Sequence, residues 1–320
     1  MRIIIYGVGA IGGTLAVRLT QTGHEVIGIA RGAQLEAIRQ SGLRLRTPEG
    51  DHDARFATII DPTEIDFRPD DVVLLTMKTQ DTLPALERLQ AAGVYEQAIF
   101  CMQNGFANED FALRRFPNVY GVVVSMPVTF LTPGEVSCFF GPKLGIFDIA
   151  RHGAGEQTHA AQVSAALESA GFAAFCHDDI APFKYAKLLV NLTNAIDACL
   201  GQQDGREDFI KAARAEARAV YAAAAIEPAD MNGREAIADF RQIPGAQAGG
   251  SSSAQSLARG AGSIETDYLN GEIALLGRKF GVPTPVNAYF ARHAKRMLFA
   301  GGGAGTMSVA EAKAALPGIG

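Results

Sequence analysis

Short apolar runs alternate with segments of helical periodicity over the first 130 residues of the chain. The runs are rich in β-branched residues, which is typical of strands buried in a parallel sheet. Strands are predicted at 2–6, 25–30, 71–77, 98–102 and 119–126, and helices at 10–23 and 84–92. Because strands and helices alternate, we expect a parallel sheet with right-handed crossovers. Residues 134–148 predict one or two further strands.

The pattern changes to helical periodicity with few β-branched runs after about residue 178. Helices are predicted at 180–200, 206–225, 263–280 and 287–299, with a polar, flexible loop at 245–253. We expect residues after about 300 to form a loosely ordered tail. The predicted fold class is α/β, with an α/β domain over 1–177 followed by an all-helical domain over 178–320. A ligand site is expected in the cleft between two such domains.

Charge and cysteine content narrow the class of protein. The chain has 29 Lys and Arg against 34 Asp and Glu, a net charge of −5, which argues against a partner that is nucleic acid or an anionic membrane. Its 4 cysteines show no CxxC spacing, so neither a disulfide framework nor a metal site is predicted, and a cytoplasmic location is expected. Glycines interrupt the longest apolar stretch, 3–17, which predicts no transmembrane span; a signal-peptide core is the alternative.

A GxGxxG motif stands between the first predicted strand and helix and comprises Gly7, Val8, Gly9, Ala10, Ile11 and Gly12. Gly7 permits a tight turn, Gly9 lets the backbone approach a pyrophosphate, and Gly12 lets the helix and strand approach closely. The helix N-terminus supplies free N–H groups for the phosphates. This context favours a Rossmann-type dinucleotide-binding domain over the alternative, a merely structural turn.

Three further residues follow strands at the expected ligand-binding edge of the sheet. Arg31 stands where an NAD-preferring site would carry an acidic residue, and it predicts NADP (NADPH) as the cofactor; a surface arginine with loose specificity is the alternative. Lys78 is a candidate to reach a cofactor phosphate or ribose, or else a solvated residue at the strand end. Asn104 offers a donor and an acceptor to the nicotinamide–ribose region, although Asn-Gly is also a favoured turn pair.

The helix predicted at 180–200 carries polar residues along one line. Lys187, Asn191 and Asn194 fall within an arc of roughly 60° on an ideal helix. Buried amides need hydrogen-bond partners, whereas a solvent-facing polar stripe is the ordinary alternative. In the block SIETDYLNG, Ser263 is a plausible N-cap. Glu265 either complements the helix dipole, or it hydrogen-bonds a substrate group or orients Lys187. Ser252 offers a hydroxyl and an N–H to a carboxylate.

Taken in order, these motifs resemble the ketopantoate reductase (2-dehydropantoate 2-reductase) family over about residues 1–300. The resemblance rests on GxGxxG, the arginine after the second strand, and four later stretches: MKTQ at 77–80, QNG at 103–105, KLxxN at 187–191, and SSxxQ with ExDYxNG within 251–271. It implies that NADPH reduces a 2-oxo acid, 2-dehydropantoate, to (R)-pantoate in pantothenate biosynthesis.

The resemblance also implies roles for the site residues. Lys187 matches the proton donor, and an unperturbed lysine is protonated at neutral pH and suited to that role. Glu265 matches an essential carboxylate, Asn191 and Ser252 match substrate-binding positions, and Asn194 is a candidate for a further one. Lys78 and Asn104 match residues near the nicotinamide half of the cofactor.

The chain departs from the family pattern only on the substrate side. Ala195 holds the place of a second helix asparagine, Asp204 replaces a further one, and one residue is inserted between Gln255 and Glu265. The sequence therefore leaves open a paralogous reductase of another 2-oxo acid or ketone, a non-catalytic NADP(H)-sensing protein, and a β-hydroxyacid-type dehydrogenase. The helical half is a candidate surface for a homodimer, but the sequence does not fix the oligomeric state.

Overall fold

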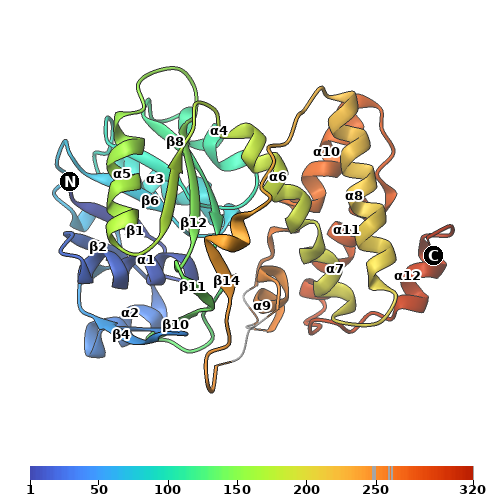
Figure 1. Cartoon of the computed structure of the whole chain (residues 1–320), viewed down its shortest axis with the longest axis horizontal. Coiled ribbons are helices and arrows are strands. Elements are labelled where there is room, and N and C mark those ends of the chain that lie inside the picture. Colours follow the sequence, from blue (N-terminus) through green and yellow to red (C-terminus); the bar gives the residue numbers. More distant parts are fainter. Residues whose placement is uncertain (247–249, 259, 261, 320) are drawn as a thin grey trace. The chain divides into compact units, whose positions relative to one another are not determined.

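The computed structural model describes residues 1–246, 250–258, 260 and 262–319 (Figure 1). The chain divides into two compact units, which we describe separately. The first unit comprises Met1–Ile180 and Met231–Ala248, and the second comprises Ala181–Asp230 and Gly249–Gly320. This division differs from the single boundary predicted at 177/178, because a segment that follows the first helices of the second unit belongs with the first.

An eight-stranded sheet forms the centre of the first unit. Its strands lie in the order β13 (Ala173–Cys176), β12 (Ile146–Arg151), β8 (Val119–Ser125), β7 (Ala98–Cys101), β6 (Val72–Leu75), β1 (Ile3–Tyr6), β2 (Val26–Ile29) and β5 (Ala57–Ile59). Neighbouring strands are parallel except β8 and β12, which pair antiparallel. The predicted α/β class with a largely parallel sheet is confirmed.

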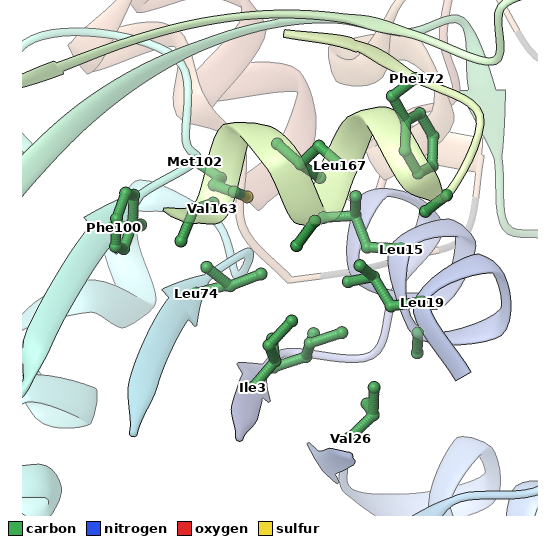
Figure 2. Close-up of a cluster of buried hydrophobic side chains, with 14 of the residues drawn as sticks. Ile3, Leu15, Leu19, Val26, Leu74, Phe100, Met102, Val163, Leu167 and Phe172 are labelled. Atoms are coloured by element: carbon green, nitrogen blue, oxygen red, sulfur yellow. The ribbon is translucent and has the colours of Figure 1, made fainter. Parts of the chain in front are cut away.

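Helices cover both faces of this sheet. Ile3 and Ile5 of β1 belong to one buried cluster, with residues of α1 (Ala10–Gln21) and α5 (Thr158–Ser169). Figure 2 shows Ile3 in this cluster with Leu15 and Leu167. Ile4 belongs to a second cluster, with residues of α3 (Thr82–Ala91) and α4 (Ala107–Leu113). Successive strand residues point to opposite faces, so a strand buried on both sides is apolar at every position, as β1 is.

Two smaller sheets complete the first unit. The four-stranded sheet has the order β4 (Gly50–Ala54), β3 (Leu43–Thr47), β10 (Glu135–Cys138) and β9 (Val128–Thr129). The two-stranded sheet pairs β11 (Phe140–Pro142) with β14 (Ala238–Phe240). The prediction of one or two strands at 134–148 was wrong, since β10, β11 and the start of β12 fall there. Short helices in this unit are α2 (Gly32–Ser41), η1 (Pro62–Glu64), η2 (Thr79–Asp81) and η3 (Arg234–Ala236).

The segment that begins at Met231 is fixed to the first unit by a buried charge cluster. Asp148 of β12 is fully buried and accepts hydrogen bonds from Arg234 Nη1 at 2.6 Å and Nη2 at 2.7 Å. His177 Nε2 lies 2.8 Å from the same carboxylate. A buried carboxylate is tolerated only when it is paired and hydrogen-bonded. This segment supplies the arginine that pairs with Asp148.

The second unit is helical. Its elements are α6 (Ala181–Asn191), α7 (Thr193–Leu200), α8 (Arg206–Ala223), α9 (Ser252–Ala258), η4 (Glu265–Tyr268), α10 (Asn270–Phe280), α11 (Pro285–Phe299) and α12 (Val309–Ala315). The helix predicted at 180–200 is interrupted at Leu192, and the one predicted at 263–280 divides into η4 and α10. Within the described ranges, none of the helices is both long enough and apolar enough to cross a membrane.

The expected loose tail after residue 300 is corrected by α12. Ser308 and Glu311 form a capping box at its start, and Met307, Ala312 and Leu316 join the buried core of the second unit. The side chain of Gln203 donates to the Met307 carbonyl at 2.8 Å. Apolar burial and capping therefore hold this segment in place. The loop predicted at 245–253 falls partly on 247–249, outside the described residues, and Ser252 and Ser253 belong to α9.

Candidate functional site

The glycine loop forms a tight turn between β1 and α1. Gly7 has a φ of +107°, and a Cβ there would lie 2.8 Å from the Met77 backbone nitrogen, so only glycine fits. The Gly7 carbonyl accepts hydrogen bonds from Gly9 N at 2.7 Å and from Thr76 Oγ1 at 2.8 Å. Thr76, directly after β6, therefore anchors the turn, a contribution that the sequence analysis missed.

The three glycines differ in what surrounds them, and the difference fits a dinucleotide. A Cβ at Gly12 would lie 2.3 Å from the Gly7 carbonyl oxygen, whereas a Cβ at Gly9 would meet nothing within 4 Å. Gly12 is thus required for close approach of helix and strand, and Gly9 faces open space. The first turn of α1 has no acidic residue, and no side chain caps it. A free helix N-terminus beside an open glycine suits a phosphate group.

Arg31 stands at the start of α2, just after β2, as predicted for a 2′-phosphate ligand. Its side chain is 82% exposed and lies 3.3 Å from the carboxylate of Asp81, which is 38% exposed. An exposed ion pair of this kind contributes little to stability. The guanidinium is therefore accessible to a phosphate, and among the described residues Asp81 is its only acidic partner.

Lys78 and Asn104 lie in two loops that a buried polar network joins. Lys78 immediately precedes η2 after β6, and Asn104 lies in the loop after β7; both side chains are partly exposed. Fully buried Asn108 connects the loops, because its Nδ2 donates to Thr79 Oγ1 at 3.2 Å and to the Asn104 carbonyl at 3.1 Å. Thr82 Oγ1 donates to Asn108 Oδ1 at 2.8 Å. Sequence reasoning missed Asn108, whose helical position gave no signal.

The candidate catalytic residues lie on two elements of the second unit. Lys187 is on α6 and half-buried, and Glu265 is the first residue of η4 and 6% exposed. Asn191, the last residue of α6, is 7% exposed, and Asn194 of α7 is 9% exposed. The alternative interpretation, a polar stripe that faces solvent, is therefore wrong for both asparagines. The convergence of Lys187 with Glu265 stays a prediction.

Asn194 and Ser252 are brought together. Asn194 Nδ2 donates to Ser252 Oγ at 3.2 Å, and the neighbouring Ser251 Oγ donates to the Asn194 carbonyl at 3.3 Å. Ser251 Oγ also accepts from Ala254 N at 3.3 Å and so holds the first turn of α9. The start of α9 is therefore attached to α7 through residues 58 and 57 positions apart in the chain.

The break between α6 and α7 coincides with a buried chain of amides. Asn270 Nδ2 donates to the Leu192 carbonyl at 3.0 Å, which lies at the break, and also to Asn287 Oδ1 at 3.0 Å. Asn287 Nδ2 in turn donates to Glu216 Oε2 at 2.8 Å. Burial raises the pKa of Glu216, while hydrogen bonds from Asn287 and Val286 oppose the rise. The three polar side chains, Asn270, Asn287 and Glu216, were not predicted.

Two of the departures from the family pattern have a structural account. Ala195 is completely buried in the core of the second unit, so this position offers no polar group to a ligand. Asp204 is exposed in the turn between α7 and α8. Asn194 stands one residue before Ala195, on the helix that begins after the break.

Family models match both parts of the chain. The model described as "Ketopantoate reductase PanE/ApbA" matches residues 3–148, and "Ketopantoate reductase PanE/ApbA C terminal" matches residues 180–297. The chain is 28% identical to the 2-dehydropantoate 2-reductase of Archaeoglobus fulgidus over 295 residues, which cover 89% of this chain and 94% of that protein. It is 29% identical to the enzyme of that name from Mesorhizobium japonicum over 313 residues, with the same coverage of 89% and 94%.

Solved structures show the same fold. A PanE/ApbA family ketopantoate reductase from Ralstonia eutropha has a TM-score of 0.78 at 28% identity, covering 94% of this chain and 99% of that one. D-mandelate dehydrogenase with NADH and anilino(oxo)acetate has a TM-score of 0.80 at 23% identity, with coverage of 94% and 99%, a likeness of fold alone. With both family models matched in order, the chain belongs to the ketopantoate reductase PanE/ApbA family of oxidoreductases.

Proposed function

We propose that this chain reduces 2-dehydropantoate to (R)-pantoate with NADPH, a step of pantothenate biosynthesis, in the cytoplasm. The single observation that carries the proposal is the match of both family models, which together span 3–148 and 180–297. The open space at Gly9 and the free N-terminus of α1 support dinucleotide binding independently of the family match.

The cofactor would be held by the glycine loop and by residues at the ends of β2, β6 and β7. The N-terminal amides of α1 bind the pyrophosphate, and the exposed Arg31 binds the 2′-phosphate that distinguishes NADPH from NADH. Lys78 and Asn104 bind the nicotinamide half. NADPH, when bound, supplies the hydride for the keto carbon of the substrate.

The second unit would supply the proton and the substrate contacts. Lys187 donates a hydrogen bond to the keto oxygen and transfers its proton as charge develops there. Glu265, which is almost fully buried, binds the substrate and orients the lysine. Asn191, Asn194 and Ser252 bind the polar groups of the substrate, and the hydrogen bond between the last two sets their relative position in advance.

A panel assay tests this proposal. The purified chain is mixed with NADPH or NADH and with 2-dehydropantoate, aliphatic 2-oxo acids or benzoylformate, and absorbance at 340 nm is followed. We expect turnover to be fastest with 2-dehydropantoate and NADPH. A flat trace across the panel, with tight NADPH binding, would instead identify an NADP(H)-sensing protein, and oxidation of 3-hydroxy acids would identify a β-hydroxyacid-type dehydrogenase.

A second candidate is a reductase of a different 2-oxo acid. The observation that favours it is Ala195, which leaves an apolar, fully buried residue where the family pattern has an asparagine. An amide shifted by one residue, with an apolar side chain in its former place, would favour a less polar substrate, because losing a hydrogen bond to a substrate hydroxyl reduces discrimination in favour of that hydroxyl. Faster turnover of benzoylformate than of 2-dehydropantoate would select this candidate.

A further inference from the structure

We propose that Gln34 is a positioning residue that fixes the glycine loop in its cofactor-binding conformation. Gln34 lies in the first turn of α2, 26 residues beyond Val8 of the loop, and is 7% exposed. The inference rests on the proposed function only as far as dinucleotide binding, and it does not depend on the substrate.

The amide of Gln34 uses its donor and its acceptor on two different backbone segments. Its Nε2 donates to the Val8 carbonyl in the glycine loop at 3.0 Å, and its Oε1 accepts from Gly134 N at 2.8 Å. The Gly134 carbonyl accepts in turn from Arg44 N, at the start of β3, at 3.0 Å. One side chain therefore ties the loop to the turn before β10, because the amide of glutamine carries both a donor and an acceptor.

The contact with Val8 controls the backbone at Gly9. A peptide group is planar and trans, so the direction of the Val8 carbonyl fixes that of the Gly9 N–H on the same plane. Gln34 holds the carbonyl, and the Gly7 carbonyl accepts from Gly9 N at 2.7 Å. The Val8–Gly9 peptide is thus held at both ends, just before the residue that faces open space. Without Gln34, the Val8 carbonyl loses a buried partner, and the peptide keeps only the restraint at its Gly9 N–H.

Gln34 also joins the two parts of the site that would meet the adenosine phosphates. Arg31 is the residue that precedes α2, and Gln34 is on the first turn of that helix. Because Gln34 bonds to the loop, the helix start that carries Arg31 is tied to the loop that would bind the pyrophosphate. We therefore expect loss of Gln34 to weaken binding of NADPH and, to a smaller degree, of NADH.

Gln34→Met is the informative variant, because methionine keeps the length and volume of the side chain and removes both hydrogen bonds. Gln97→Met is the matched control in the same unit. Gln97 is 9% exposed and also bridges two backbone segments, since its Oε1 accepts from Tyr95 N at 3.0 Å and its Nε2 donates to the Arg68 carbonyl at 3.2 Å. It lies just before β7, at the end of the parallel sheet opposite the glycine loop.

The experiment measures Kd for NADPH by nicotinamide fluorescence, kcat at saturating NADPH, Tm, and hydrogen exchange of the peptide that covers residues 7–12. We expect both variants to lower Tm by a similar amount. Only Gln34→Met should raise the Kd about fivefold and speed exchange in the loop, with kcat within twofold of the wild-type value, since one neutral hydrogen bond is worth about 1 kcal/mol. A Kd within twofold of wild type, or an equal rise in Gln97→Met, overturns the inference.

If Gln34→Met does not fold, Gln34→Glu is the variant that tests the inference. It keeps the acceptor for Gly134 and places a carboxylate oxygen against the Val8 carbonyl, so the Kd should rise more than tenfold. Wild-type protein that binds neither nucleotide defeats the proposed function together with this inference. Wild-type protein that binds NADPH but turns over no oxo acid defeats the proposed reaction alone, and the comparison of the Gln34 and Gln97 variants remains decisive.

Discussion

The side-chain amide of Asn194 donates a hydrogen bond to the hydroxyl of Ser252 at 3.2 Å. The two residues come from α7 and from the start of α9, and both were candidates for substrate binding on sequence grounds alone. Their contact means that the one-residue shift from the family pattern, which places alanine at 195, does not separate the amide from the serine. An amide NH2 has two donors and a hydroxyl both donates and accepts, so this single contact uses only part of the hydrogen-bonding capacity of the pair.

Replacing Asn194 by alanine should lower kcat/KM for the 2-oxo acid. The loss of one polar contact in a buried site is worth about 1–3 kcal/mol, so we expect a decrease of about 10–100-fold. NADPH affinity, measured by fluorescence, should stay within twofold. Ser251→Ala is the control, because Ser251 Oγ bonds to backbone at Asn194 and Ala254 and should affect Tm instead of KM. Equal kinetic effects of the two variants would contradict the assigned role of Asn194.

Replacing Lys187 by alanine should nearly abolish turnover. General-acid catalysis contributes about 10²–10⁴-fold to rates, and kcat should fall by that factor while the Kd for NADPH is unchanged. Lys279→Ala is the control, because Lys279 is an exposed lysine near the end of α10 in the same unit. Single-turnover absorbance at 340 nm measures the chemical step directly. Full activity in the Lys187 variant would remove it as the proton donor.

The two glycines Gly9 and Gly12 should respond differently to the same added methyl group. Gly9→Ala introduces a Cβ with nothing within 4 Å, so it should fold with nearly wild-type Tm and bind NADPH at least tenfold more weakly. Gly12→Ala introduces a Cβ 2.3 Å from the Gly7 carbonyl oxygen and should cost about 1–3 kcal/mol or more in unfolding free energy. Urea denaturation and NADPH titration separate these effects. Tight NADPH binding by Gly9→Ala would mean that the pyrophosphate lies elsewhere.

Arg31→Ala should change the preference between cofactors. A charge-assisted hydrogen bond to a phosphate is worth about 1.5–3 kcal/mol, so the Kd for NADPH should rise about 10–100-fold, with that for NADH within threefold. Because the ion pair with Asp81 is exposed and contributes little to stability, the substitution should change Tm only slightly. Asp81→Ala is the converse variant, and it should lower the Kd for NADPH because it removes a carboxylate that competes for Arg31. A parallel loss of both cofactors in Arg31→Ala would count against a 2′-phosphate contact.

The partly buried Glu216 should make stability depend on pH. Burial raises its pKa in the folded protein, so the folded state holds the proton more tightly than the unfolded state. Its contribution to stability is therefore complete below the ordinary carboxyl pKa, about 4.3, and is lost as the pH rises through the higher folded value. Urea denaturation between pH 4 and 7 should show this decline, and Glu216→Gln should lack it.

The glutamine variant of Glu216 also tests the hydrogen bonds. Both carboxylate oxygens accept from backbone N–H groups, of Val286 at 2.7 Å and of Asn287 at 3.0 Å. An amide NH2 in place of one oxygen leaves a donor facing a donor, which should cost about 1–3 kcal/mol at pH 7. A variant as stable as wild type at pH 7 would show that these contacts contribute nothing net.

The fold was predictable where residues close together in the sequence determine the structure. Ile3, Ile4 and Ile5 signalled a strand buried on both faces, and GxGxxG signalled the turn that follows it. The capping box of Ser308 and Glu311 is equally local, since serine followed three residues later by glutamate is a sequence signature of a helix start, here that of α12.

Features that depend on distant partners were not predictable. Leu188, Leu192 and Ile196 fit one continuous helix, and only Asn270, 78 residues beyond Leu192, reveals the contact at the break. Gln34 likewise carries no local sign of its role, because Gly134 lies 100 residues away. A polar residue in a helix becomes informative once its burial is known, since a buried amide must have partners.

The pairing of Asp148 with Arg234 determines which fragments of the chain could fold separately. A fragment that stopped at residue 180 would leave a fully buried carboxylate without its arginine and would expose the edge of β11 that β14 covers. An isolated nucleotide-binding half would have to carry residues 231–246 as a second piece. Chimeras that recombine this protein with a relative should therefore exchange both stretches from the same parent.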